Sequence, residues 1–134
     1  MWEKFIFIAT ISGIGAVTRA PVGVMRTVAQ TRDMIAQAIH EIIAVAWDYV
    51  INLPGDIFQR TMKFIDGMPP QSTFSMQRDI MEGRPSELEA QNGAVVRLGA
   101  ARDVKTPLHS FLYYSLLPLE LRARGQIDRA VWGE

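Results

Sequence analysis

The sequence predicts an all-α fold, and three observations support this class. No segment alternates apolar and polar residues over the length of a strand. Prolines and glycines divide the chain into pieces of helical length. Five apolar residues also recur at spacings of three or four, which places them on one face of a helix: Ile35, Ile39, Ile42, Ala46 and Val50. We therefore expect about six helices and no sheet.

Length and composition fit a single domain over residues 1–134, in which 49% hydrophobic residues supply a core. The 14 basic residues balance the 14 acidic ones, so no net charge attracts nucleic acid. The chain has no cysteine, which excludes disulfides and thiolate metal sites and fits a reducing cytoplasm. Its two isolated histidines do not suggest a metal site.

The first helix is expected from Trp2 to about Thr18. Gly13 and Gly15 interrupt it, and glycines inside an apolar helix usually permit close approach of another backbone or of a ligand. The apolar run Phe5–Val17 spans thirteen residues, fewer than the roughly 20 that cross a bilayer. We expect a buried helix rather than a membrane segment; a membrane-associated helical protein is the alternative.

A second helix is expected from near Thr31 to Ile51, with Thr27 or Thr31 as its N-cap. Asp56 should cap a third helix that ends at about Ile65.

A short fourth helix should run from Phe74 to Met81, with Gly83 as the residue just beyond its end. Ser86 and Glu89 have the spacing of a capping box, which predicts a fifth helix towards about Val104. Thr106 should cap the last long helix, which begins at Pro107 and continues through Leu116. The residues from Gly125 onwards are expected to form a tail.

Taken alone, the chemical candidates have ordinary explanations. Lys4 heads an apolar segment and would usually be a solvated charge, although a lysine beside a pocket can donate to an oxyanion. Glu87 suits the first turn of a helix, where it complements the helix dipole. Gly13-x-Gly15 is not a dinucleotide fingerprint, since it lies within a helical pattern and lacks the third glycine.

Motifs spread over the whole chain resemble the C-terminal domain of the ketopantoate reductase (2-dehydropantoate 2-reductase) family. The segment Trp2–Phe5 is similar to the family's W-x-K-L, and Phe74–Ile80 resembles its S-S-M-x-x-D. The segment Gly83–Gly93 resembles G-R-x-T-E-I-D-x-x-N-G, and Val104–Pro107 resembles V-x-T-P. The resemblance implies a helical substrate-binding and dimerisation domain like that of 6-phosphogluconate dehydrogenase.

The resemblance also implies roles for single residues. Lys4 matches the catalytic lysine that polarises the 2-oxo group and protonates the alkoxide. Glu87 matches a glutamate that contacts substrate hydroxyls and positions the lysine, and Ser75 matches a serine that binds the substrate carboxylate. The family usually places asparagines one and two turns beyond the lysine. Here those positions hold Ile8 and Ser12, so Ser12 remains a substrate-binding candidate while ketopantoate itself fits poorly.

In the intact family, hydride comes from NADP bound by a G-x-G-x-x-G Rossmann domain, which should precede Trp2. We expect no cofactor and no activity for this chain alone. The expected partners are a small 2-oxo acid and either a homodimer or a separate Rossmann-domain chain, since the segment Phe5–Ile14 should otherwise be exposed. A non-catalytic dimerisation or protein-interaction module with the same fold is the alternative.

Overall fold

The computed structural model describes all 134 residues, which form helices and connecting loops without a β-strand. The all-α fold class is thus confirmed. The elements are α1 (Trp2–Thr18), α2 (Val22–Thr27), α3 (Ala29–Asp48), α4 (Ile57–Asp66), α5 (Ser75–Met81), the π-helical turn η1 (Glu89–Gly93), α6 (Ala94–Ala101), α7 (Pro107–Ala123) and the 3-10 turn η2 (Arg129–Trp132).

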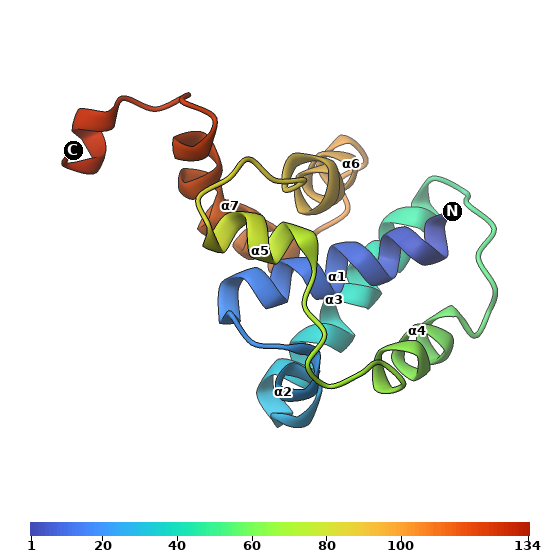
Figure 1. Ribbon diagram of the computed structural model, residues 1–134. Helices are drawn as coiled ribbons and strands as arrows, with labels where there is room; N and C mark the ends of the chain where they lie inside the picture. Colours follow the sequence, from blue (N-terminus) through green and yellow to red (C-terminus); the bar gives the residue numbers. More distant parts are fainter.

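Helix α1 is surrounded by the rest of the chain and packs against α3, α4, α5, α7 and η1 (Figure 1). Because its neighbours cover nearly every side, the segment from Ala9 to Ala16 is buried without interruption. The expectation that Phe5–Ile14 would be exposed is therefore wrong for Ala9–Ile14, whereas Phe5, Phe7 and Ile8 are half-buried. No helix combines the length and the apolar character needed to cross a membrane.

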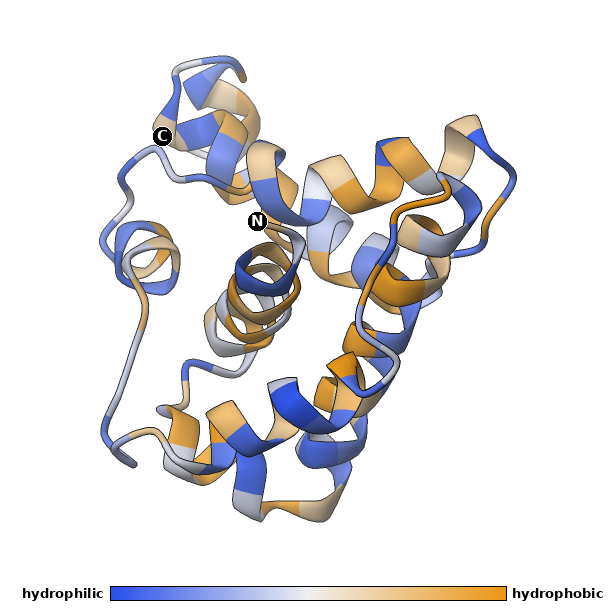
Figure 2. Cartoon of the chain, turned by 90° about the vertical axis from the view of Figure 1, so that its right-hand side faces the viewer, coloured by the Kyte–Doolittle hydropathy of each residue, from blue (hydrophilic) through white to orange (hydrophobic).

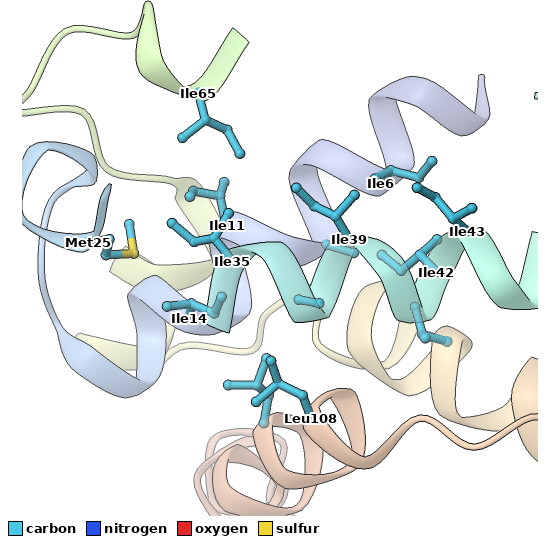
Figure 3. Packing of buried hydrophobic residues seen from close by; sticks show 14 of the residues in the cluster. Ile6, Ile11, Ile14, Met25, Ile35, Ile39, Ile42, Ile43, Ile65 and Leu108 are labelled. Atoms are coloured by element: carbon cyan, nitrogen blue, oxygen red, sulfur yellow. The ribbon is translucent and has the colours of Figure 1, made fainter. Parts of the chain in front are cut away.

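The main core lies between α1 and α3, where isoleucines from both helices interlock. Figure 3 shows this packing, to which α2, α4 and α7 each add one labelled side chain, Met25, Ile65 and Leu108 respectively. Colouring by hydropathy shows hydrophobic and hydrophilic positions interspersed along the helices (Figure 2).

The predicted stripe along α3 is confirmed at its first four positions, which are all fully buried. Its fifth member, Val50, is 87% exposed. Helix α3 ends at Asp48, and Val50 adopts a positive φ of 58° in the turn that follows. Val50 has the helical spacing in the sequence, but it lies beyond the last residue of α3, so the spacing does not place it on the buried face.

Helix α2 was not expected, because Pro21 and Gly23 resemble a loop signal. Pro21 occupies the N-cap position of α2, and the Thr27 hydroxyl donates to the carbonyl of Gly23 at 2.6 Å. The Thr31 hydroxyl donates to the carbonyl of Met25, also at 2.6 Å. Neither threonine therefore caps α3, which begins two residues earlier than Thr31.

Two further capping predictions are partly or wholly wrong. Asp56 is the N-cap residue of α4 but accepts no amide hydrogen there, and its carboxylate lies 3.7 Å from Arg60. The predicted capping box is wrong for Glu89, whose carboxylate pairs with Arg97 at 2.6 Å and not with the amide of Ser86, although the Ser86 hydroxyl does accept from the amide of Leu88 at 3.2 Å. Gly83, by contrast, adopts the positive φ of 74° expected just beyond the end of α5.

Helix α7 begins at Pro107 as predicted, but its amides are capped from another helix. The buried carboxylate of Glu41, on α3, accepts from the amides of Leu108 at 2.8 Å and His109 at 3.0 Å. Thr106 makes no capping hydrogen bond. A carboxylate is favoured at this place because it satisfies free amides and complements the helix dipole.

The C-terminal segment, predicted to be a tail, contains the 3-10 turn η2. After α7 the chain turns back at Gly125, and the ring of Trp132 on η2 stacks beneath the guanidinium of Arg122 at 4.6 Å. This segment still projects from the body of the molecule (Figure 1).

Candidate functional site

Lys4 lies on the first turn of α1, where its side chain is exposed and forms no salt bridge. It borders a cavity of about 420 Å³ between α1 and α4. The other lining residues are Glu3, Phe7, Ile8, Ile57, Arg60, Thr61 and Phe64. A volume in this range suits a small molecule.

The second cation at this cavity, Arg60, is already paired. Its guanidinium lies 3.0 Å from the carboxylate of Glu3 and 3.7 Å from that of Asp56. These groups are about half exposed, so the pairs add little stability. Lys4 is therefore the cation at the cavity that no protein carboxylate neutralises.

Ser12 lies two turns beyond Lys4 on the same helix and is 1% exposed. Spacings of four residues keep Lys4, Ile8 and Ser12 on neighbouring parts of one face. Ile8 lines the cavity and Ser12 does not.

Ser75 is the first residue of α5 and is exposed. The preceding residue, Phe74, packs its ring edge-to-face on Phe7 of α1, with centroids 5.7 Å apart. Phe7 makes a second such contact with Phe64 of α4, at 4.8 Å. These aromatic contacts fix the start of α5 beside the N-terminal half of α1, close to the cavity.

Glu87 is exposed in the loop before η1, between two buried neighbours. On one side, Ser86 donates its amide and its hydroxyl to the buried carboxylate of Glu120, at 3.1 and 2.8 Å. Arg124 binds the same carboxylate at 2.7 Å and donates to the Ser86 carbonyl at 2.9 Å. On the other side, Leu88 is fully buried. The backbone that carries Glu87 is thus held firmly by α7.

The π-helical turn η1 brings Asn92 into the interior, where it joins three helices. Its amide nitrogen lies 3.1 Å from the carbonyl of Ala9 and 3.1 Å from Nδ1 of His109. Nε2 of His109 lies 2.9 Å from the carbonyl of Ala38 and must donate to it. Nδ1 then accepts from Asn92, so the ring is neutral; burial lowers the pKa of His109.

The glycines of α1 allow polar side chains to approach the helix. A Cβ on Gly13 would lie 2.7 Å from the amide nitrogen of Asn92. A Cβ on Gly15 would lie 2.6 Å from the amide oxygen of Gln77, on α5. The sequence left open the approach of another backbone or of a ligand, but the space beside both glycines is taken by side-chain amides.

The helices that follow Ser75 and Glu87 both pack against α1, on which Lys4 lies, but neither Ser75 nor Glu87 lines the cavity beside Lys4. No hydrogen bond or salt bridge joins any two of Lys4, Ser12, Ser75 and Glu87. Sequence reasoning did not identify Arg60, Thr61 or the residues that hold the Glu87 loop, because these depend on contacts across the fold. No three His, Asp or Glu side chains gather as metal ligands.

The fold is that of the helical domain of ketopantoate reductases. It superposes on the PanE/ApbA family ketopantoate reductase of Ralstonia eutropha JMP134 with a TM-score of 0.84 at 24% identity, covering 92% of this chain and 41% of that one. The 2-dehydropantoate 2-reductase of Methylococcus capsulatus gives a TM-score of 0.81 at 27% identity, covering 91% and 39%.

The chain belongs to the ketopantoate reductase family: the model "Ketopantoate reductase PanE/ApbA C terminal" matches residues 1–120. The curated 2-dehydropantoate 2-reductase of Nostoc sp. is 29% identical over 127 residues, which are 94% of this chain and 40% of that protein. The corresponding enzyme of Pyrobaculum aerophilum is 26% identical over 112 residues, 84% of this chain and 40% of that protein. The chain thus spans about two fifths of the length of these relatives.

Proposed function

We propose that this chain forms the substrate-binding part of an NADP-dependent reductase that converts a 2-oxo acid into a 2-hydroxy acid. The observation that carries the proposal is the unneutralised ammonium of Lys4 beside a cavity on α1. The segments carrying Ser75 and Glu87 pack against the same helix.

The chemistry of carbonyl reduction explains why these residue types would act together. Negative charge builds on the carbonyl oxygen as it is reduced, and a nearby cation lowers that barrier. Nζ of Lys4 would donate to this oxygen and then supply its proton. The Ser75 hydroxyl would donate to the substrate carboxylate. Glu87 would orient the lysine.

The residues of this chain do not fit the nucleotide. A dinucleotide site needs a glycine-rich turn between a strand and a helix, and the structure has no strand. The spaces beside Gly13 and Gly15 are filled by Asn92 and Gln77. Nucleotide binding would fall to protein outside these 134 residues, either in the same polypeptide or in a partner chain.

A partner copy is also part of the proposal. The ketopantoate reductase of Staphylococcus aureus, described as dimeric, shares this fold with a TM-score of 0.84 at 24% identity. We expect this chain to self-associate, which sedimentation at micromolar concentration would test. A monomer at all concentrations would contradict this part of the proposal.

The test of the reductase proposal is to join the nucleotide-binding part of the Nostoc relative ahead of Met1 and to follow NADPH oxidation with a panel of 2-oxo acids. We expect turnover that falls by at least about a hundredfold in Lys4→Met. Lys105→Met is the matched control, since Lys105 is a fully solvated lysine paired only with Asp103. A well-folded chimera that binds NADPH but reduces no 2-oxo acid would favour a non-catalytic interaction module instead.

A further inference from the structure

We propose that the α1–α4 cavity receives an apolar substituent of the 2-oxo acid, so that the substrate carries an aliphatic or aromatic group without hydroxyls. This inference rests on the proposed function, because Lys4 must hold the 2-oxo group at the edge of that cavity. It goes further by naming the class of substrate that the cavity selects.

The walls of the cavity are apolar on both helices. Phe7 and Ile8 contribute from α1, and Ile57 and Phe64 contribute from α4. Phe64 is 59% exposed although its ring packs on Phe7. An exposed aromatic ring over an apolar recess offers surface that a ligand would remove from water.

The polar side chains that line the cavity are bonded within the protein or lie half exposed at its rim. The Thr61 hydroxyl donates to the carbonyl of Ile57 at 2.8 Å and is buried, so this residue presents mainly its methyl group. The guanidinium of Arg60 is shared between two carboxylates at the rim. Lys4 forms no ion pair, and its role is to meet the oxygen that is reduced, whereas Glu3 and Arg60 pair with each other at the rim.

A hydroxyl on a substituent that lies against the four apolar side chains of the cavity would lose its hydrogen bonds to water and gain no partner from them. Burying a polar group without a partner is costly, whereas burying a methyl group in the same place is favourable. Ile8 contributes directly to this selection, because it stands on the face of Lys4 and has no hydrogen-bonding group.

The decisive experiment compares ketopantoate with trimethylpyruvate, which differ by one hydroxyl, and adds pyruvate as a third acid. Trimethylpyruvate is ketopantoate with that hydroxyl replaced by hydrogen, and pyruvate lacks the branched group altogether. Binding of each to the protein is measured by calorimetry. We expect trimethylpyruvate to bind at least about tenfold more tightly than either of the others. Amide chemical shifts should move in residues 4–8 and 57–64.

Two variants connect this preference to the cavity. Ile8→Asn supplies an amide to the wall and should reduce the preference for trimethylpyruvate over ketopantoate by about tenfold. Phe64→Ala should weaken binding of trimethylpyruvate. Trp47→Ala is the control and should not, because Trp47 is a similarly exposed aromatic residue at the C-terminal end of α3 that does not line the cavity.

The outcomes separate this inference from the proposed function. Tighter binding of ketopantoate, still dependent on Lys4, would overturn the apolar class and leave the reductase proposal intact. Binding of trimethylpyruvate that Phe64→Ala leaves unchanged would overturn the role of the cavity. Failure of all three acids to bind, in the chimera as well, would remove both proposals.

Discussion

At the scale of single residues, the interior depends on a few buried polar groups whose partners lie far away in the sequence. Asn92 binds Ala9 and His109, and Glu41 caps a helix that begins 66 positions later at Pro107. Each of these side chains hydrogen-bonds a buried polar group that water cannot reach. Substitution of these residues should therefore cost more than their size suggests.

Gly13→Ala is expected to destabilise the protein by about 2 kcal/mol, although alanine is the better helix former by about 1 kcal/mol. The added methyl group would lie within 2.8 Å of both polar atoms of the Asn92 amide, which is buried and bound on other sides. Urea unfolding measures the change. Gly55→Ala is the control, because nothing lies within 4 Å of its Cβ position. Equal stability of the two variants would contradict the tight contact.

Glu41→Ala is expected to cost about 2–3 kcal/mol in the free energy of unfolding, since two buried amides lose a charged acceptor. Glu41→Gln retains one acceptor oxygen and should lose about half as much. Chemical denaturation of both variants provides the measurement. A loss below about 0.5 kcal/mol for the alanine variant would mean that water replaces the cap.

His109 should make stability depend on pH. Burial lowers its pKa in the folded protein, so the unfolded chain binds a proton more readily. Stability is then full above the unfolded value of about 6.5 and is lost as pH falls towards the folded value, at up to about 1.4 kcal/mol per pH unit. We expect His109→Gln to reduce this slope between about pH 6.5 and 5. An unchanged slope would show that other groups cause the acid sensitivity.

At the scale of elements, periodicity and helix-stop signals predicted most of the fold. The fully buried positions of α3 follow from the spacing of Ile35, Ile39 and Ile42, and the end of α5 follows from Gly83. Capping was less predictable. The acceptors that matter, Glu41 and Glu120, come from other helices, whereas sequence rules consider only the neighbouring residues.

The loop that carries Glu87 should depend on Glu120. Replacing Glu120 with alanine leaves the Ser86 amide and the Arg124 guanidinium without their acceptor, which should cost about 3 kcal/mol and speed hydrogen exchange at the Ser86 and Leu88 amides. Arg122→Ala is the control, because Arg122 contacts only the projecting C-terminal segment. Unchanged exchange in Glu120→Ala would contradict the role of α7 in holding this loop.

At the scale of the whole molecule, the motifs and the fold agree on the family. The candidate site, by contrast, depends on how distant segments of the chain pack together. The sequence indicated which residues to consider, but it could not show that Phe74 anchors the start of α5 on α1 and that Ser86 anchors the Glu87 loop on α7. It also did not reveal the α1–α4 cavity, whose second wall comes from a helix that carries no family motif. Long-range packing supplies both features.

The central claim is that Lys4, Ser75 and Glu87 serve one bound 2-oxo acid. Titrating the isotope-labelled protein with trimethylpyruvate while recording amide chemical shifts tests this claim most directly. We predict that the amides of Lys4, Ser75 and Glu87 all move and that their shifts fit a single dissociation constant, which weakens together in Lys4→Met. Separate constants, or shifts confined to one of the three segments, would contradict a shared site.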